Sequence, residues 1–171
     1  MGFDYIAYRR TARSGRYKLQ KRSFKMIEAM RCFTDNDGLM VLDVGATDGF
    51  MLRQYQSQLN IRRSLGIEPT IEYIKSRPDD SATLIQGIGE SIPFRDATFD
   101  VITVASVLDH MNKPSLFLKE ARRVLKKSGI IIISLVHPFY DTLAVKFRFK
   151  EDDHAFRFTE KRLAELLKDN G

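Results

Sequence analysis

The sequence has little cysteine and no long hydrophobic run. Cys32 is the only cysteine in 171 residues, so neither an internal disulfide nor a zinc-binding cysteine cluster can form. The longest purely aliphatic run, Ile130 to Ile133, is far shorter than the roughly 20 residues that cross a bilayer. Arg9 and Arg10 also interrupt any secretory signal at the N-terminus. These absences predict a cytoplasmic protein with no membrane span, in which Cys32 is a small buried apolar group.

Acidic residues are missing between residues 9 and 25, where eight basic residues stand. Removing those eight from the 28 basic residues leaves 20 against 22 acids, so the net charge of +6 belongs to this stretch. We therefore expect a basic N-terminal helical arm, residues 1–36, followed by one domain over residues 37–171. The arm could bind nucleic acid or an anionic membrane through its cations and Tyr5, Tyr8 and Tyr17, or it could be a solvated helix that covers a ligand site.

Short apolar segments alternate with helical patterns along the domain. The strand candidates are 39–44, 64–67, 83–86, 100–105 and 130–135, and the last, being the most apolar, is expected in the centre of the sheet. Apolar residues at helical spacing predict helices over 19–33 and 70–75, with Phe33 on the apolar face of the first. A further helix is expected to begin at Pro114 and to end at Gly129. Thr159 caps a last helix with Leu163, Leu166 and Leu167 on one face. This order predicts an α/β fold with a Rossmann-like, doubly wound and mainly parallel sheet.

The first strand runs into a glycine-containing turn, Asp43 to Gly49. A strand, a glycine turn and a helix form a place where the backbone approaches a ligand closely and helix amides point outward. The turn has neither the G-x-G-x-x-G spacing of dinucleotide enzymes nor the Gly-Lys-Ser/Thr of a P-loop. Asp43 would repel a pyrophosphate and suit an ammonium group, so we expect a zwitterionic or cationic cofactor.

Glu68 stands about twenty residues beyond this turn, at the end of the second strand. A carboxylate at that position can accept hydrogen bonds from both ribose hydroxyls of an adenosine. Alone, Glu68 could be a surface acid before Pro69, and Asp43 a turn or capping acid. Together, at this spacing, the two acids favour S-adenosylmethionine as the cofactor.

With these residues in place, the sequence resembles the class I S-adenosylmethionine-dependent methyltransferases, especially those of ubiquinone and menaquinone biosynthesis. The resemblance covers residues 39–136 and is strongest in VLDVGATDGF (41–50), in GIGESIPF (87–94) with DATFDVI (96–102), in LDH (108–110) and in RRVLKKSG (122–129). Such proteins close their sheet with a C-terminal antiparallel strand pair. We expect this chain to lack that pair and to be C-terminally truncated, with an open sheet edge that could pair with another copy.

The resemblance also implies roles for individual residues. The turn with Asp43, Gly45, Ala46, Thr47 and Gly49 would approach the methionine part, Glu68 the ribose, and Pro69 the adenine ring. The segment with Ile88, Gly89 and Glu90 would line the adenine edge, and Ala105 and Ser106 would offer carbonyls to the amino group. Two departures stand out: Ile88 replaces a usual acid, and Thr47 replaces a frequent glycine.

Histidines follow the fourth and fifth strands, at the edge where open α/β sheets bind ligands. His110 could be a general base or a substrate contact, or a loop histidine satisfied locally. His137, Tyr140 and Asp141 are weaker candidates at the same edge. Methyl transfer requires alignment of the acceptor and exclusion of water more than a base. The sequence therefore predicts transfer of a methyl group to a small-molecule acceptor. The alternatives are a non-catalytic module that binds the cofactor or its product, and an RNA-modifying enzyme recruited by the arm.

Overall fold

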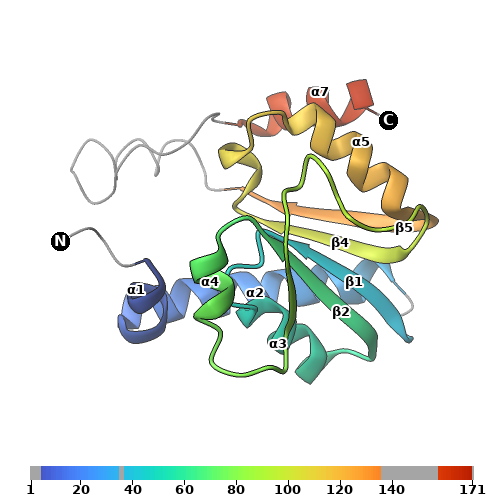
Figure 1. Ribbon diagram of the computed structural model, residues 1–171. Helices are drawn as coiled ribbons and strands as arrows, with labels where there is room; N and C mark the ends of the chain where they lie inside the picture. Colours follow the sequence, from blue (N-terminus) through green and yellow to red (C-terminus); the bar gives the residue numbers. More distant parts are fainter. Residues whose placement is uncertain (1–4, 35–36, 136–157, 171) are drawn as a thin grey trace.

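A five-stranded parallel sheet forms the centre of the molecule. The computed structural model describes residues 5–34, 37–135 and 158–170 (Figure 1). The strand order is β3-β2-β1-β4-β5, with every adjacent pair parallel. The strands are β1 (Leu39–Val44), β2 (Ile61–Glu68), β3 (Thr83–Gln86), β4 (Phe99–Ala105) and β5 (Leu125–Ser134). The predicted α/β fold with a Rossmann-like parallel sheet is confirmed.

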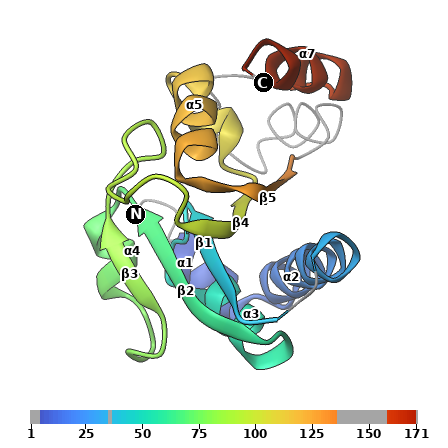
Figure 2. The ribbon, with the colours of Figure 1, turned by 90° about the vertical axis from the view of Figure 1, so that its right-hand side faces the viewer.

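Helices cover both faces of the sheet (Figure 2). On one face lie α2 (Arg13–Phe33) and α3 (Phe50–Gln58), and on the other lie α5 (Pro114–Val124) and α7 (Glu160–Asn170). Three short helical elements, α1 (Tyr5–Thr11), α4 (Ile71–Lys75) and the 3-10 turn η1 (Leu108–His110), lie where the strands end (Figure 1). The sheet thus separates two helical layers.

Each layer has its own hydrophobic core, because side chains alternate along the strands. Leu42 and Val44 of β1 point toward α5, where Phe117, Ala121 and Val124 are buried. Val41 points the other way, toward α2 and α3, in a core that contains Leu19, Met26, Ile27, Met30, Leu52 and Tyr55. The apolar side of α2 is therefore part of the main core.

Several local predictions hold, and others are wrong. Strands 39–44 and 83–86 have the expected bounds, and Thr159 does cap α7, since its Oγ1 accepts the Arg162 amide at 3.2 Å. Gly129, in contrast, lies inside β5, because α5 ends at Val124 and the chain continues directly into a strand. Strand β5 is at the margin of the described sheet, not in its centre. Its isoleucines alternate between the two cores, so a fully apolar run needs cover on both faces but not a central position.

Two residues of α2 that were predicted to be buried are exposed. Cys32 is exposed, and Phe33 is 72% exposed. Both stand in the last turn of α2, and neither belongs to the core that its inner side forms with the sheet. The periodicity identified the inner face correctly but not how far along the helix that face is covered.

Some predictions concern residues outside the described ranges. His137, Tyr140 and Asp141 lie there. The absence of a closing antiparallel pair, and pairing of copies through an open edge, remain predictions. Among the described helices, none combines the length and the apolar character that a bilayer crossing needs.

Candidate functional site

The residues predicted to bind a cofactor gather at the edge where the parallel strands end. The Gly45–Gly49 turn follows β1, Glu68 is the last residue of β2, and Ala105 is the last residue of β4. The residues after β3, Gly87 to Ser91, form a tight bend in which the Ser91 amide donates to the Ile88 carbonyl at 3.2 Å. This edge is where α1 and α4 also lie (Figure 1).

Asp43 and Glu68 project from the same face of the sheet. In the parallel register Asp43 of β1 is opposite Gly66 of β2, and paired residues point to the same side. Glu68 is two residues beyond Gly66, so its side chain also points toward the α2 and α3 layer. Both carboxyl groups are nearly inaccessible, with 1% and 5% exposure. The register thus places two buried acids on one side of the sheet, on the two strands that flank the turn.

A hydroxyl group of the neighbouring strand β4 holds the Asp43 carboxylate in position. Thr103 of β4 is opposite Asp43 in the register, and its Oγ1 donates to Asp43 Oδ1 at 2.6 Å. Tyr55 of α3 is fully buried in the same layer. Burial raises the pKa of the Tyr55 hydroxyl well above its ordinary value, and the charge of Asp43 raises it further. Asp43 is therefore a positioned group beneath the turn.

Glu68 joins the turn to the next loop. Its Oε2 accepts the Thr47 amide at 2.9 Å, and its Oε1 accepts the Thr70 amide at 3.1 Å. A carboxylate offers about four lone-pair sites, so each oxygen keeps one for a further donor. Glu68 is thereby fixed in orientation and can still accept two hydrogen bonds from a pair of adjacent hydroxyls.

The turn itself packs so closely that glycine is required at its two ends. Gly45 and Gly49 have φ of +74° and +76°, and an added Cβ would lie 2.5 Å from Val107 and 2.5 Å from Ala82 respectively. The amides of Gly45 and Ala46 both donate to the Ile67 carbonyl, at 2.9 and 3.1 Å. With the Thr47 amide on Glu68, three amides of the turn face β2. The amides predicted to point outward are those of the helix that follows the turn, α3, and that stays a prediction.

Close contacts bring the other predicted residues to the same place. The Val107 side chain packs on Gly45, which joins the loop after β4 to the turn after β1. Gly89 packs against Val44, so the loop after β3 reaches the end of β1. The Gln86 side chain donates to the Pro69 carbonyl at 3.1 Å. Four loops from four strand ends therefore meet around one point.

A comparison with protein families identifies this arrangement. A family model described as "Methyltransferase domain" matches residues 42–133, more than half of the chain, from within β1 to within β5. The chain belongs to this methyltransferase family. The resemblance to class I S-adenosylmethionine-dependent methyltransferases is confirmed, and S-adenosylmethionine is the cofactor of such enzymes.

Relatives of the methyltransferase include proteins of archaea and bacteria. The uncharacterised protein MJ1123 of Methanocaldococcus jannaschii is 29% identical over 136 residues, which cover 76% of this chain and 62% of that protein. The demethylmenaquinone methyltransferase of Thermotoga maritima is 27% identical over 158 residues, which cover 77% of this chain and 69% of that enzyme. The chain thus spans about two thirds or less of the length of these relatives.

Solved structures share the fold of the methyltransferase. One similar chain comes from the complex between the Haloferax volcanii Trm112 methyltransferase activator and a methyltransferase. It has a TM-score of 0.78 at 19% identity, and the match covers 100% of this chain and 77% of that one. A methyltransferase from Aquifex aeolicus, described as SAM dependent, has a TM-score of 0.72 at 20% identity, with 99% and 89% covered. At this identity the likeness concerns the fold.

Three predicted residues of the methyltransferase have surroundings that the sequence did not indicate. Ile88 is 49% exposed, an apolar side chain at the margin of the site. Glu90 accepts the amides of Asn112 and Lys113 at 3.1 and 3.3 Å, so its carboxylate fastens its loop to the start of α5. His110 is exposed in η1, and its amide donates to the Val107 carbonyl.

Two residues with a part in this geometry were not among the predicted ones. Thr103 holds Asp43, and the only signal for it is a polar residue inside the apolar strand Val101 to Val104. Arg10 of α1 pairs with Asp48 of the turn at 3.0 Å and also donates to the Ser76 carbonyl after α4. No local pattern distinguishes Arg10 from the other cations of the arm.

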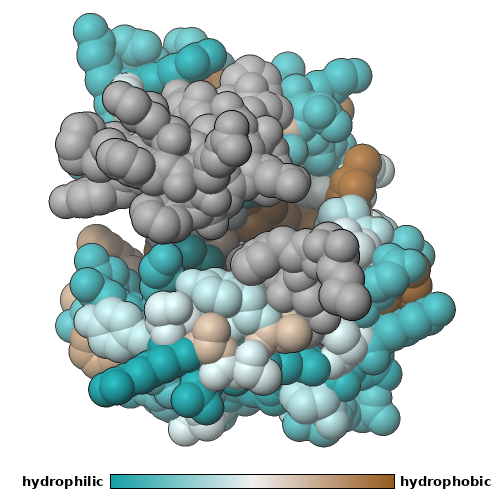
Figure 3. Space-filling view, turned by 90° about the vertical axis from the view of Figure 1, so that its left-hand side faces the viewer, coloured by the Kyte–Doolittle hydropathy of each residue, from teal (hydrophilic) through white to brown (hydrophobic). Residues whose placement is uncertain are grey.

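Hydrophobic side chains are visible at this edge when the molecule is seen from the side where the strands end (Figure 3). Two cavities lie elsewhere: one of about 370 Å³ is lined by Met40, Arg62 and Lys126, and one of about 440 Å³ lies between α5, β5 and α7. Neither contains a predicted site residue, so the strand-end edge carries the functional assignment.

Proposed function

We propose that the protein transfers a methyl group from S-adenosylmethionine to an acceptor bound at the strand-end edge. The observation that carries the proposal is the placement of two buried carboxylates, Asp43 and Glu68, on one face of the sheet beside a glycine turn. The amides of Gly45, Ala46 and Thr47 are bonded to β2, so none of these three is left to donate to a phosphate. This arrangement favours a ligand with an ammonium group and a ribose over a dinucleotide.

The residues present fit the cofactor. Glu68 has lone pairs left for the two ribose hydroxyls, and the backbone of Gly45 to Gly49 would adjoin the methionine part near Asp43. Pro69 and the segment Ile88 to Glu90 would border the adenine, where the exposed apolar side chain of Ile88 suits a ring face. The carbonyls of Ala105 and Ser106 would accept from the amino group.

For methyl transfer, the main task of the protein is to align the acceptor with the methyl group. S-adenosylmethionine supplies an activated methyl group on a sulfonium, which is displaced in line by the acceptor. The four loops would hold the acceptor in that line, and the hydrophobic side chains visible at this edge would help to exclude water. His110, which is exposed in the loop after β4, would take a proton from an acceptor that must lose one.

The acceptor class is open to two proposals. A small molecule agrees with relatives named for menaquinone biosynthesis. A nucleic acid is favoured by the surface of α2, which is described below. A non-catalytic module that only holds the cofactor is the alternative to both, and product formation across acceptor pools separates them. We also propose that α1, at the start of the basic arm, covers the site through its contact with the glycine turn. From the single cysteine, we propose that the protein works in the reducing cytoplasm.

Calorimetric titration of the Glu68→Gln variant tests the cofactor site. The substitution leaves one acceptor oxygen in place of a carboxylate, so S-adenosylmethionine and S-adenosylhomocysteine should both bind more weakly by about 1 to 3 kcal/mol. Glu165→Gln, at an exposed position of α7, is the matched control and should bind as the wild type does. Tighter binding of NAD than of either nucleoside would refute the proposal.

A further inference from the structure

The exposed side of α2 carries an alternating row of cations and aromatic rings. Arg13, Tyr17, Lys21 and Phe24 follow one another at intervals of four, four and three residues, so they lie along one side of the helix. Tyr17 is 63% exposed and Phe24 is 54% exposed, and both basic side chains are exposed as well. We call these four residues the α2 stripe. At a rise of about 1.5 Å per residue it is about 16 Å long.

Positive charge surrounds the α2 stripe without neutralisation. Arg16, Lys18 and Lys25 flank it on the exposed surface. Among the described residues, none of these three forms an ion pair, and neither does Arg13 or Lys21. The first acid of the helix is Glu28, beyond the end of the stripe. A surface of unpaired cations is complementary to a polyanion.

The apolar groups of the α2 stripe fit nucleobases better than lipid. The aliphatic side chains of the helix, Leu19, Met26, Ile27 and Met30, are all buried against the sheet. Exposed aromatic rings between phosphate-binding cations are the usual platform for single strands, because every base can stack on a ring. Tyr17 and Phe24 are about 10 Å apart along the helix axis, the length of about three stacked nucleotides at about 3.4 Å each.

The α2 stripe also leads toward the candidate site. Helix α2 begins at the edge where the strands end and runs beneath the sheet toward the opposite edge (Figure 1). Arg13 is therefore at the site end of the stripe, just after α1, whose Arg10 contacts Asp48 of the glycine turn. A strand bound along the stripe would continue past Arg13 to the loops that surround the proposed methyl donor.

We propose that the α2 stripe binds single-stranded nucleic acid and directs it to the strand-end edge. Phosphates contact Arg13 and Lys21, and two bases stack on Tyr17 and Phe24. That the bound strand is also the methyl acceptor rests on the proposed function, whereas binding itself does not.

Fluorescence anisotropy with a labelled oligouridylate of about 12 nucleotides tests binding in the full chain. The double variant Tyr17→Ala/Phe24→Ala should bind at least about tenfold more weakly at unchanged salt dependence, because it removes stacking. Arg13→Gln/Lys21→Gln should reduce the slope of log affinity against log salt by about 1.4, the amount for two phosphates of a single strand. Leu116→Ala/Lys119→Gln makes the same kinds of change on the exposed surface of α5 and should leave binding unaltered.

Further arms define what would overturn the proposal. Oligothymidylate distinguishes a preference for RNA from a general preference for single strands. Binding that is absent in the wild type, equal in all variants, or stronger for phosphatidylglycerol vesicles than for the oligonucleotide contradicts it. Calorimetry with S-adenosylmethionine on the same variants shows that they are folded. It also separates the two proposals. If the wild type does not bind S-adenosylmethionine, the proposed function is refuted, whereas the proposed nucleic-acid surface is not affected.

Discussion

At the scale of single residues, the Tyr55 hydroxyl is the group whose surroundings are most unusual. It is buried in the core, and its oxygen makes no hydrogen bond of ordinary geometry among the described residues, since the nearby Thr103 hydroxyl donates to Asp43 instead. A buried hydroxyl without a partner costs about 1 to 3 kcal/mol relative to its hydrated state. The ring, in contrast, fills the core between α3 and the sheet.

We therefore expect Tyr55→Phe to raise the free energy of unfolding at pH 7 by about 1 kcal/mol, since it removes the uncompensated hydroxyl and keeps the ring. The ordinary tyrosine pKa is about 10, and the pKa of Tyr55 in the folded protein is higher. The unfolded chain thus loses this proton first, and wild-type stability should fall as the pH rises above about 10. Urea unfolding at neutral and alkaline pH measures both effects.

The other tyrosines are common to both proteins, so the difference between wild type and Tyr55→Phe isolates this group. A variant that is less stable at pH 7, or that loses stability at high pH as steeply as the wild type, would show that the hydroxyl is bonded in solution.

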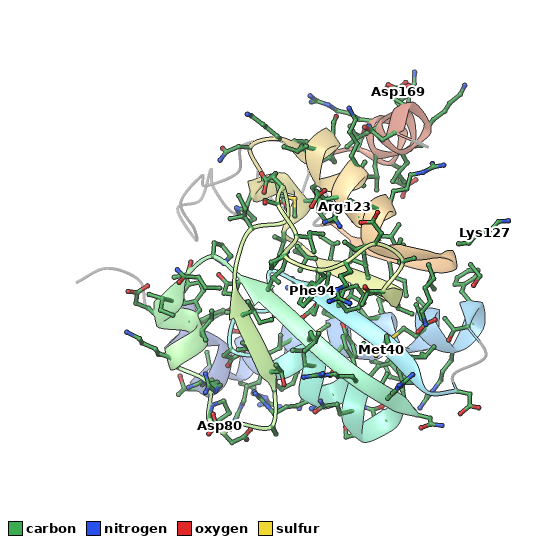
Figure 4. The ribbon with its side chains drawn as sticks, turned by 45° about the vertical axis from the view of Figure 1, so that its right-hand side comes forward. Met40, Asp80, Phe94, Arg123, Lys127 and Asp169 are labelled. Carbon is green, nitrogen blue, oxygen red and sulfur yellow. The ribbon has the colours of Figure 1, made fainter. Side chains whose placement is uncertain are left out.

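At the scale of elements, Arg123 fastens the connection between β3 and β4 to α5. Its guanidinium donates to the Phe94 and Ile92 carbonyls at 2.8 and 2.9 Å and to Glu120 at 2.7 and 2.8 Å. Glu120 in turn accepts the Ile92 amide at 2.9 Å. Figure 4 shows Arg123 on α5 near the connection that carries Phe94. These bonds hold the connection that carries Ile92 and Phe94, just after Ile88 and Glu90, against α5.

Glu120→Gln should lower the free energy of unfolding at pH 7 by about 1 to 2 kcal/mol, because hydrogen bonds to a charged group are replaced by weaker ones. The bond from Arg123 lowers the pKa of Glu120 in the folded protein. Its contribution is therefore present above the unfolded pKa of about 4.3 and is lost as the pH falls through the lower folded value. The variant should lose less stability than the wild type between neutral pH and pH of about 3.

Urea denaturation at the two pH values measures this difference, with Glu165→Gln on α7 as the exposed control. Equal acid sensitivity in wild type and Glu120→Gln would mean that the bond between Glu120 and Arg123 is absent in solution.

At the scale of the whole molecule, an ion pair between described residues joins the N-terminal arm to the site. Arg10 pairs with Asp48, whose side chain is 4% exposed, and Asp48 Oδ1 accepts the Phe50 amide at the start of α3 at 3.3 Å. Arg10 also donates to the Ser76 carbonyl. The first helix is thus tied to the loops after β1 and β2 at once.

Arg10→Gln should loosen α1, so that proteolysis within residues 5–12 becomes several-fold faster, and raised salt should produce part of the same effect in the wild type. Arg13→Gln is the matched control, because Arg13 forms no ion pair among the described residues. Cleavage rates followed by mass spectrometry measure the effect. Equal rates for the two variants would show that this pair does not hold the arm.

The sequence alone was sufficient to predict that the strands exist, which fold class they form, and that acids lie near the strand ends. Strands such as Leu39–Val44 are short apolar segments bounded by turn residues, and a parallel sheet with alternating helices must bring Asp43 and Glu68 to the same edge. The turn of Gly45 to Gly49 was also recognisable, because positive φ and close packing leave glycine as the residue of choice.

Only the tertiary structure decided what surrounds these residues. Thr103 holds Asp43 across 60 residues of chain, and Arg10 reaches Asp48 across 38. The amides of Gly45, Ala46 and Thr47 face β2. Phe33 and Cys32 are exposed, although their local patterns suggested otherwise. Periodicity reports which side of an element is apolar. The packing of distant elements decides how far that side is covered and which polar groups meet, because such contacts depend on where the whole chain returns in space.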